Sequence, residues 1–190
     1  MRSFIAIELP EELKETLRRI QEKLKSSGAD VKWVEPKNIH LTLKFLGEIN
    51  DEQLPKIICA LQDIAGHSEG FLLRLSSLGA FPKISFPRII WAGIDKGESE
   101  TKILAKKLED RLIKIGLSKV EHPFSSHITI GRTRSNLGRD KLVAGLNNLM
   151  NGFEGMPQEL LVNKITLLKS TLTPQGPIYE TLKEISLTTS

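Results

Sequence analysis

Apolar residues repeated at helical spacing predict four amphipathic helices along this chain. The first helix follows Pro10, a residue well suited to the first position of a helix, and it stops at Gly28. The third helix stops at Gly116, because glycine readily adopts the left-handed backbone conformation of a C-cap. The four apolar stripes span residues 13–24, 54–64, 104–115 and 142–149.

Segments of buried or alternating apolar character predict strands between the helices. A turn holding Pro82 and Pro87 is expected between two of them, and a Pro- and Gly-rich turn at residues 173–177 joins the last two. Helix–strand units recur twice, which favours an α+β fold, and we expect residues 1–190 to form a single domain of two pseudo-symmetric lobes. The predicted strands are residues 4–9, 31–34, 40–46, 71–78, 88–94, 127–130, 164–172 and 178–187.

One four-residue pattern occurs twice, once in each half of the chain. The first copy is His40-Leu41-Thr42-Leu43 and the second is His127-Ile128-Thr129-Ile130. Because alternate side chains of a strand share a face, each histidine lies about 7 Å from its threonine on one face, while the aliphatic residues point to the other. We expect one motif in each lobe (residues 40–43 and 127–130), with the two copies meeting across one cleft.

Composition narrows the class of protein without adding a site. A hydrophobic content of 39% and a charged content of 26% are typical of a soluble globular chain, and the net charge of +4 allows a phosphate-bearing partner without requiring one. The single cysteine excludes an internal disulfide and an all-cysteine zinc site. No apolar run approaches the roughly 18 residues of a membrane span, and Glu8 comes too early for a signal peptide. We therefore expect a cytoplasmic protein.

The paired motifs suggest acid–base chemistry on an anion. Imidazoles titrate near neutral pH, so one can take a proton from an oxygen while the other gives one. Nearby Lys44, Arg132 and Arg134 can add positive charge, and a guanidinium matches two phosphate oxygens at once. Two imidazoles, two hydroxyls and a cation around one anion favour phosphodiester chemistry without a metal.

Two simpler interpretations compete with this one. A lone His-x-Thr is usually a partly buried strand histidine, but two copies of the same polarity in separate halves weaken that interpretation. The chain lacks His-Glu-x-x-His and has no carboxylate at ligand spacing beside either histidine. We therefore expect neither a metal site nor a cofactor.

Residues 34–48 and 124–132, which contain the two motifs, resemble the bacterial and archaeal 2′-5′ RNA ligase family. Its members are also called RNA 2′,3′-cyclic phosphodiesterases and belong to the two-histidine phosphoesterase superfamily. Residues 2–7 and 170–180 are similar to that family too, so the resemblance spans almost the whole chain. The chain departs from the family at Ser126 and Gly131, where proline and alanine are commoner; both changes are small.

The resemblance implies a bilobal fold in which each lobe is an antiparallel sheet backed by outer helices, around a central cleft. It implies opening of a terminal RNA 2′,3′-cyclic phosphate to a 2′-phosphate, with His40 as general acid to the leaving O3′ and His127 as general base on water. Thr42, Thr129 and Arg132 would hold the phosphate. The implied partners are RNA ends or tRNA fragments with a 2′,3′-cyclic phosphate, and a monomer is expected. ATP-independent 2′-5′ ligation would be the same chemistry with an RNA 5′-hydroxyl in place of water.

The sequence leaves other functions open. A non-catalytic RNA- or nucleotide-binding module could keep the same phosphate site, and a related phosphodiesterase could act on a small cyclic nucleotide or a 2′-5′ oligoadenylate. Outside the motifs, Tyr179 and Phe45 are candidates for contacting a nucleobase. Trp33 and Trp91 are expected in the core, and His67 in a solvated loop.

Overall fold

The computed structural model describes residues 1–119, 121–150 and 152–189. In chain order the elements are β1 (Arg2–Glu8), α1 (Glu11–Lys25), β2 (Val31–Trp33), the 3-10 helix η1 (Pro36–Asn38), β3 (His40–Glu48), α2 (Gln53–Gly66), β4 (Phe71–Lys83), β5 (Phe86–Ile94), α3 (Glu98–Lys114), β6 (His127–Thr133), α4 (Arg139–Asn148), β7 (Glu159–Val162), β8 (Lys164–Thr173) and β9 (Gly176–Ser186).

The strands form two antiparallel sheets, each with one histidine strand. The first sheet has the order β3-β1-β8-β9, and the second has the order β2-β6-β5-β4-β7. The expected α+β fold with two antiparallel sheets is thus confirmed. His40 opens β3 at the edge of the first sheet, and His127 opens β6 inside the second.

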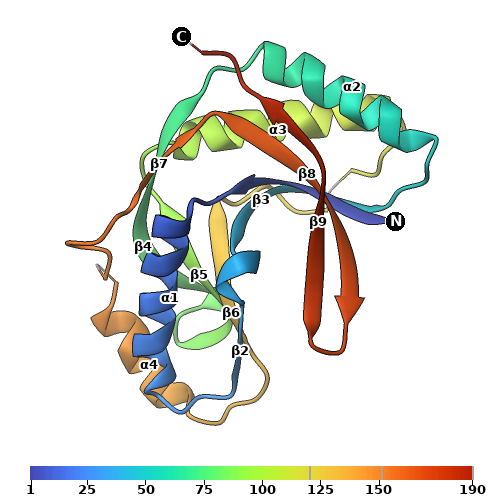
Figure 1. The fold of residues 1–190 in the computed structure, drawn as a ribbon. Helices are drawn as coiled ribbons and strands as arrows, with labels where there is room; N and C mark the ends of the chain where they lie inside the picture. The colour runs from blue at the N-terminus through green and yellow to red at the C-terminus, as the bar shows by residue number, and fades with distance from the viewer. Residues whose placement is uncertain (120, 151, 190) are drawn as a thin grey trace.

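Two helices back each sheet, and a helix does not always pack on the sheet whose strand precedes it in the chain. In Figure 1, α2 and α3 lie over the first sheet, while α1 and α4 lie beside the second; β9 contacts α2, β3 contacts α3, and β6 contacts α1. The aliphatic residues of both motifs belong to one continuous core, which also includes apolar residues of all four helices. The core therefore lies behind both histidine strands and leaves their other faces free for polar side chains.

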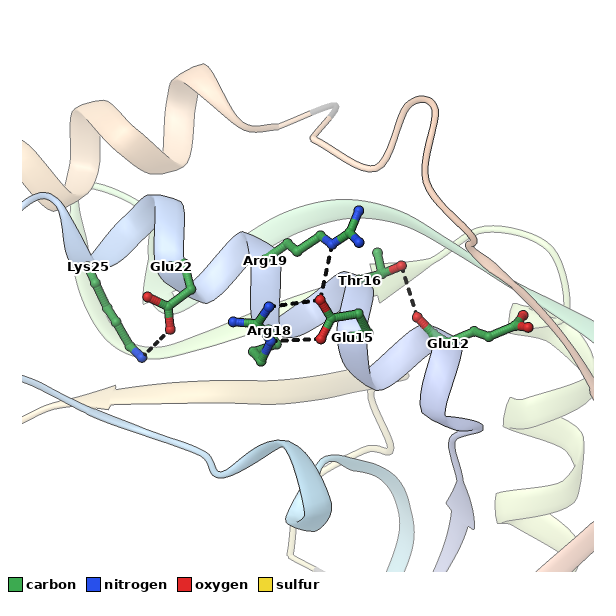
Figure 2. Close-up of polar contacts among 7 residues, drawn as sticks. All are labelled: Glu12, Glu15, Thr16, Arg18, Arg19, Glu22 and Lys25. Atoms are coloured by element: carbon green, nitrogen blue, oxygen red, sulfur yellow. Dashed lines mark hydrogen bonds and ion pairs between the residues drawn. The ribbon is translucent and has the colours of Figure 1, made fainter.

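The outer face of α1 is held by ion pairs within the helix (Figure 2). The Glu15 carboxylate accepts hydrogen bonds from Arg18 at 2.7 and 2.8 Å and from Arg19 at 3.1 Å, and these bonds lower its pKa to about 2. Lys25 pairs with Glu22 at 2.7 Å in the same way. These basic side chains already have anionic partners, so this face resembles an ordinary solvated helix surface.

Three details of the predicted elements were wrong or missing. Pro82 lies inside β4 and Pro87 inside β5, so the turn between these strands is shorter than the proline positions suggested. The third helix begins at Glu98, six residues before its first predicted apolar position at 104, and β7 was not predicted. Gly116 has φ 91°, which confirms the left-handed cap.

Candidate active site

Two hydrogen bonds hold the ring of His40. Its Nδ1 lies 2.8 Å from the backbone carbonyl oxygen of Asn38, and because a carbonyl only accepts, Nδ1 carries the hydrogen. In the neutral ring Nε2 is then the acceptor, and the Thr42 hydroxyl donates to it at 2.9 Å. The Nε2 lone pair therefore points to the face of β3 that carries Thr42 and accepts the hydrogen bond from its hydroxyl.

His127 is anchored in the same way on the second sheet. Its Nδ1 lies 2.8 Å from the carbonyl oxygen of Ser125, again two residues earlier, so Nδ1 donates and Nε2 is left as the basic nitrogen. A backbone carbonyl keeps accepting this bond when the ring is protonated. Both rings can therefore exchange a proton at Nε2 without turning.

A bulge in β3 decides which later side chains share the face of His40. Ala6 pairs with Thr42, but Ile5 pairs with Lys44, so Leu43 is an extra residue in β3. Cross-strand partners share a face, and Lys44 therefore lies on the core side with Ile5. Simple alternation would have placed Lys44 beside Thr42.

The prediction that Lys44 supplies positive charge to a phosphate is wrong. Its side chain is buried, its ammonium pairs with the Glu109 carboxylate, and it donates to the Ser118 carbonyl oxygen at 3.2 Å. The bulge turns Lys44 toward α3, where it links the strand to the helix.

A second bulge, at the matching position of β6, determines the face on which Arg132 lies. Thr129 and Gly131 pair with consecutive residues of β5, so Ile130 is the extra residue. Gly131 therefore faces the core, and Arg132 returns to the face that carries His127 and Thr129. Without this bulge the guanidinium would point into the core.

Aromatic rings surround His40 on its open face. The ring centroid of buried Phe4 lies 4.9 Å from that of His40, and Tyr179 from β9 lies edge-on at 5.3 Å. Phe45, which follows the bulge, returns to this face and is 64% exposed. Both nucleobase candidates, Tyr179 and Phe45, thus lie on the face of the first sheet that carries His40.

His127 has its own aromatic neighbours on the second sheet. Phe81 lies edge-on with a centroid distance of 5.0 Å, and Trp91 lies at 6.4 Å. The Trp91 indole fits over Gly79 and against Gly93, since a Cβ at Gly79 would meet the indole at 2.2 Å. Trp91 is therefore a neighbour of the histidine, and the prediction that it belongs to the core is wrong.

The surroundings of His40 lower the pKa of its imidazole. Burial is the main cause, because it disfavours the charged ring. The bond to Asn38 and the nearby Glu8 carboxylate act in the other direction, and the Lys14 ammonium adds to the lowering. An anion bound at this ring would favour the imidazolium.

The pKa of His127 is also lowered, first by burial and also by the positive charge of Arg132, against the bond to Ser125. The same Arg132 guanidinium acts on Tyr179, whose pKa is raised by burial. Arg132 on the second sheet thus lies near Tyr179 on the first, whose ring touches His40. Strands β3 and β6 also contact each other. Arg132 therefore acts electrostatically on His127 and on Tyr179, the aromatic neighbour of His40.

Comparison with known proteins decides the family. Residues 7–91 and residues 96–179 each match the family described as LigT like Phosphoesterase, and each segment contains one of the two motifs. The chain belongs to the LigT-like phosphoesterase family. The resemblance noted in the sequence is confirmed.

Relatives within the LigT-like family match along almost their full length. An RNA 2′,3′-cyclic phosphodiesterase of Methanothermobacter thermautotrophicus is 34% identical, with 98% of this chain and 99% of the relative covered. A protein of the same name from Aquifex aeolicus is 36% identical, with 98% and 97% covered. Among solved structures, Escherichia coli LigT complexed with 3′-AMP has a TM-score of 0.77 at 25% identity, with 98% of each chain covered.

The sequence also singled out Trp33, His67 and Arg134. Trp33 packs against the core, as expected, and His67 is exposed after α2. Arg134 is exposed at the end of β6, where its backbone amide donates to the Asp30 carbonyl oxygen. Across the described ranges, no group of three or more His, Cys, Asp or Glu side chains could hold a metal ion. No helix in those ranges is long and apolar enough to cross a membrane.

Sequence patterns missed the residues that reach the histidines from other elements. Glu8 lies opposite His40 on β1, Lys14 approaches it from α1, and Phe81 approaches His127 from β4. Only the cross-strand register brings Glu8 to His40, and no local motif signals it.

Proposed function

We propose that this protein is a metal-independent RNA 2′,3′-cyclic phosphodiesterase that opens a terminal cyclic phosphate to a 2′-phosphate. His40 is the general acid and His127 the general base, while Thr42, Thr129 and Arg132 hold the phosphate. The observation that carries the proposal is the matched anchoring of the two rings, each with Nδ1 donating to a backbone carbonyl oxygen two residues earlier, so that Nε2 is the nitrogen that exchanges a proton. The family membership and the relatives' common name support the same chemistry.

The reaction follows from these positions. Nε2 of His127 takes a proton from water as the water oxygen attacks phosphorus, and the bond from phosphorus to O3′ breaks. His40 gives its Nε2 proton to the departing O3′, so a 2′-phosphate and a free 3′-hydroxyl remain. The two threonine hydroxyls and the Arg132 guanidinium stabilise the extra negative charge that develops on the phosphoryl oxygens.

Electrostatic differences support the assignment of acid and base. A carboxylate, Glu8, lies near His40 and favours the imidazolium that a general acid needs. A guanidinium, Arg132, lies near His127 and favours the neutral ring that a general base needs. The sequence left this choice to the family resemblance alone.

The proposal extends to the setting of the reaction. RNA ends and tRNA fragments with a 2′,3′-cyclic phosphate are the proposed substrates, and an RNA 5′-hydroxyl in place of water would give 2′-5′ ligation without ATP. We propose a monomer that acts in the cytoplasm as a single domain of two pseudo-symmetric lobes. Two observations support the pseudo-symmetry: each half of the chain matches the family, and each motif has a bulge at its last residue.

The experiment is incubation of purified protein with RNA ending in a 2′,3′-cyclic phosphate, in EDTA, beside His40→Ala and His127→Ala. His67→Ala is the matched control, since His67 is exposed on the loop after α2. We expect a 2′-phosphate product from the wild type and the control, and a loss of at least about 10³-fold in either motif variant.

The other outcomes separate the alternatives. RNA bound without turnover would refute the enzyme and favour the binding module. A 3′-phosphate product would reverse the leaving oxygen and refute the proposed acid–base geometry. Loss of turnover in EDTA, restored by a divalent metal, would refute the metal-independent mechanism.

A further inference from the structure

A pocket of about 270 Å³ opens beside His40. His40 lines it together with residues from α1, η1, β1, β8 and β9, whereas Thr42, Thr129, His127 and Arg132 are not among its walls. The pocket is therefore next to the general acid but separate from the phosphate-binding groups. A group that continues from the reactive phosphate past His40 would enter it.

The proposed reaction determines what that group is. The attacking water and the leaving O3′ lie on opposite sides of phosphorus in an in-line displacement. Since His40 protonates O3′, the ribose that carries O3′ lies on the His40 side. Its nucleoside and the 5′-phosphate that links it to the rest of the RNA must then continue on the same side.

The pocket has an apolar wall that suits a nucleoside. Tyr179 presents its ring from β9, edge-on to His40, and Ile178 is 54% exposed beside it. A sugar and a base can cover such apolar surface, and a π-face accepts any base. This wall alone would not distinguish a nucleoside from another flat ligand.

Charged residues of both signs line the pocket. Glu8, bonded by the Thr166 hydroxyl at 2.8 Å, lies beside His40 and disfavours a second phosphate there. Lys14 of α1 and Lys37 of η1 line the other walls. Lys14 is close enough to His40 to lower its pKa, and the Lys37 side chain is 75% exposed at the rim.

Neither lysine is bound to a buried partner. Lys14 pairs with Glu11 at 3.2 Å and Lys37 with Glu35 at 2.9 Å, and both carboxylates are more than half exposed. Exposed pairs of this kind are weak and exchange readily for a phosphate, which carries more charge.

Resting on the proposed function, we infer that this pocket binds the terminal nucleoside of the RNA and that Lys14 and Lys37 contact its 5′-phosphate. The enzyme therefore reads one phosphate beyond the reactive one. A nucleotide with a 5′-phosphate is a better substrate than the same nucleoside 2′,3′-cyclic phosphate without it.

The test compares adenosine 2′,3′-cyclic phosphate with its 5′-phosphorylated form. For the wild type we expect the 5′-phosphate to raise kcat/KM about tenfold, mainly through KM, and the gain to shrink as salt is raised. In the double variant Lys14→Gln/Lys37→Gln the ratio between the two substrates should fall to near one when each enzyme is assayed at its own pH optimum, because loss of Lys14 also acts on the pKa of His40. Lys56→Gln/Lys102→Gln, at exposed lysines on α2 and α3, removes the same charge elsewhere and should keep the wild-type ratio.

Two results would overturn the inference. An unchanged ratio in the double variant would show that the lysines do not contact the 5′-phosphate. An equal loss with both substrates would place their effect at the reactive phosphate. Turnover of adenosine 2′,3′-cyclic phosphate by the wild type tests the proposed function separately, so failure of the pocket and failure of the enzyme are distinguishable.

Discussion

Glu8 and His40 are direct partners in the antiparallel β1–β3 ladder, and their side chains share one face of the first sheet. The Thr166 hydroxyl donates to the Glu8 carboxylate at 2.8 Å, which keeps this charge in place. On the second sheet the partner of His127 is Gly93, and the nearby charge is the guanidinium of Arg132. A carboxylate therefore acts on His40 together with the Lys14 ammonium, whereas the charge that acts on His127 is positive.

We expect Glu8→Gln to move the His40 limb of the pH profile of kcat/KM to lower pH. The carboxylate favours the imidazolium, so its removal lowers the pKa of His40, against the lowering already caused by burial and Lys14. Glutamine keeps an oxygen that can accept from Thr166. The measurement is the pH profile with a 2′,3′-cyclic phosphate, and a profile that is unchanged or moved to higher pH would contradict the role of Glu8.

Replacing Arg132 should affect both rate and pH dependence. Arg132→Gln removes the positive charge that is proposed to contact the phosphate, and it should lower kcat/KM by about 10²–10³-fold. The pKa of His127 should rise at the same time, because its positive neighbour is lost, so the limb of His127 moves to higher pH. Arg134→Gln, at the exposed end of β6, is the control. Equal losses in both variants would argue against a specific role for Arg132.

Lys44 should matter for stability and not for phosphate binding. Lys44→Met breaks the ion pair with Glu109 and removes the hydrogen-bond donor to the Ser118 carbonyl oxygen, and we expect a loss of about 3 kcal/mol in the free energy of unfolding. The folded variant should keep the wild-type KM, because Lys44 points away from His40. Urea unfolding and steady-state kinetics check the two parts. A raised KM with unchanged stability would restore Lys44 as a phosphate ligand.

The alternation of polar and apolar residues was enough to predict the strands of both motifs and the face on which each histidine lies. It failed from the last residue of each motif, Leu43 and Ile130, because a bulge depends on the partner strand and leaves no local pattern. The extra residue in β3 turns Lys44 toward the core, and the extra residue in β6 turns Arg132 away from it. Position in the sequence offered Lys44, Arg132 and Arg134 alike as sources of positive charge, and only the family resemblance singled out Arg132.

Residues from distant elements were beyond the reach of sequence patterns for a related reason. Glu8 is 32 positions from His40, and their pairing is set by how β1 lies against β3. Lys14 reaches the same ring from a helix whose own apolar stripe packs on the other sheet. Such neighbours depend on how distant helices and strands pack together in the fold, which no single segment of the sequence encodes.

The last prediction concerns Gly131, where the resembling family more often has alanine. A Cβ at this position would lie 2.9 Å from Cγ1 of Val31 and 3.0 Å from Cε3 of Trp33, both on β2. Gly131→Ala should therefore push β2 outward, lower the free energy of unfolding by about 1 kcal/mol, and reduce kcat/KM a few-fold by displacing the adjacent Arg132. Gly66→Ala, whose Cβ meets nothing within 4 Å, is the control and should leave both quantities unchanged. In Gly131→Ala/Val31→Ala the nearest clash is removed, so activity should return toward the wild-type value even if the lost burial of Val31 keeps the melting temperature low. Activity that stays low in the double variant would contradict a steric origin and point to the backbone of the bulge itself.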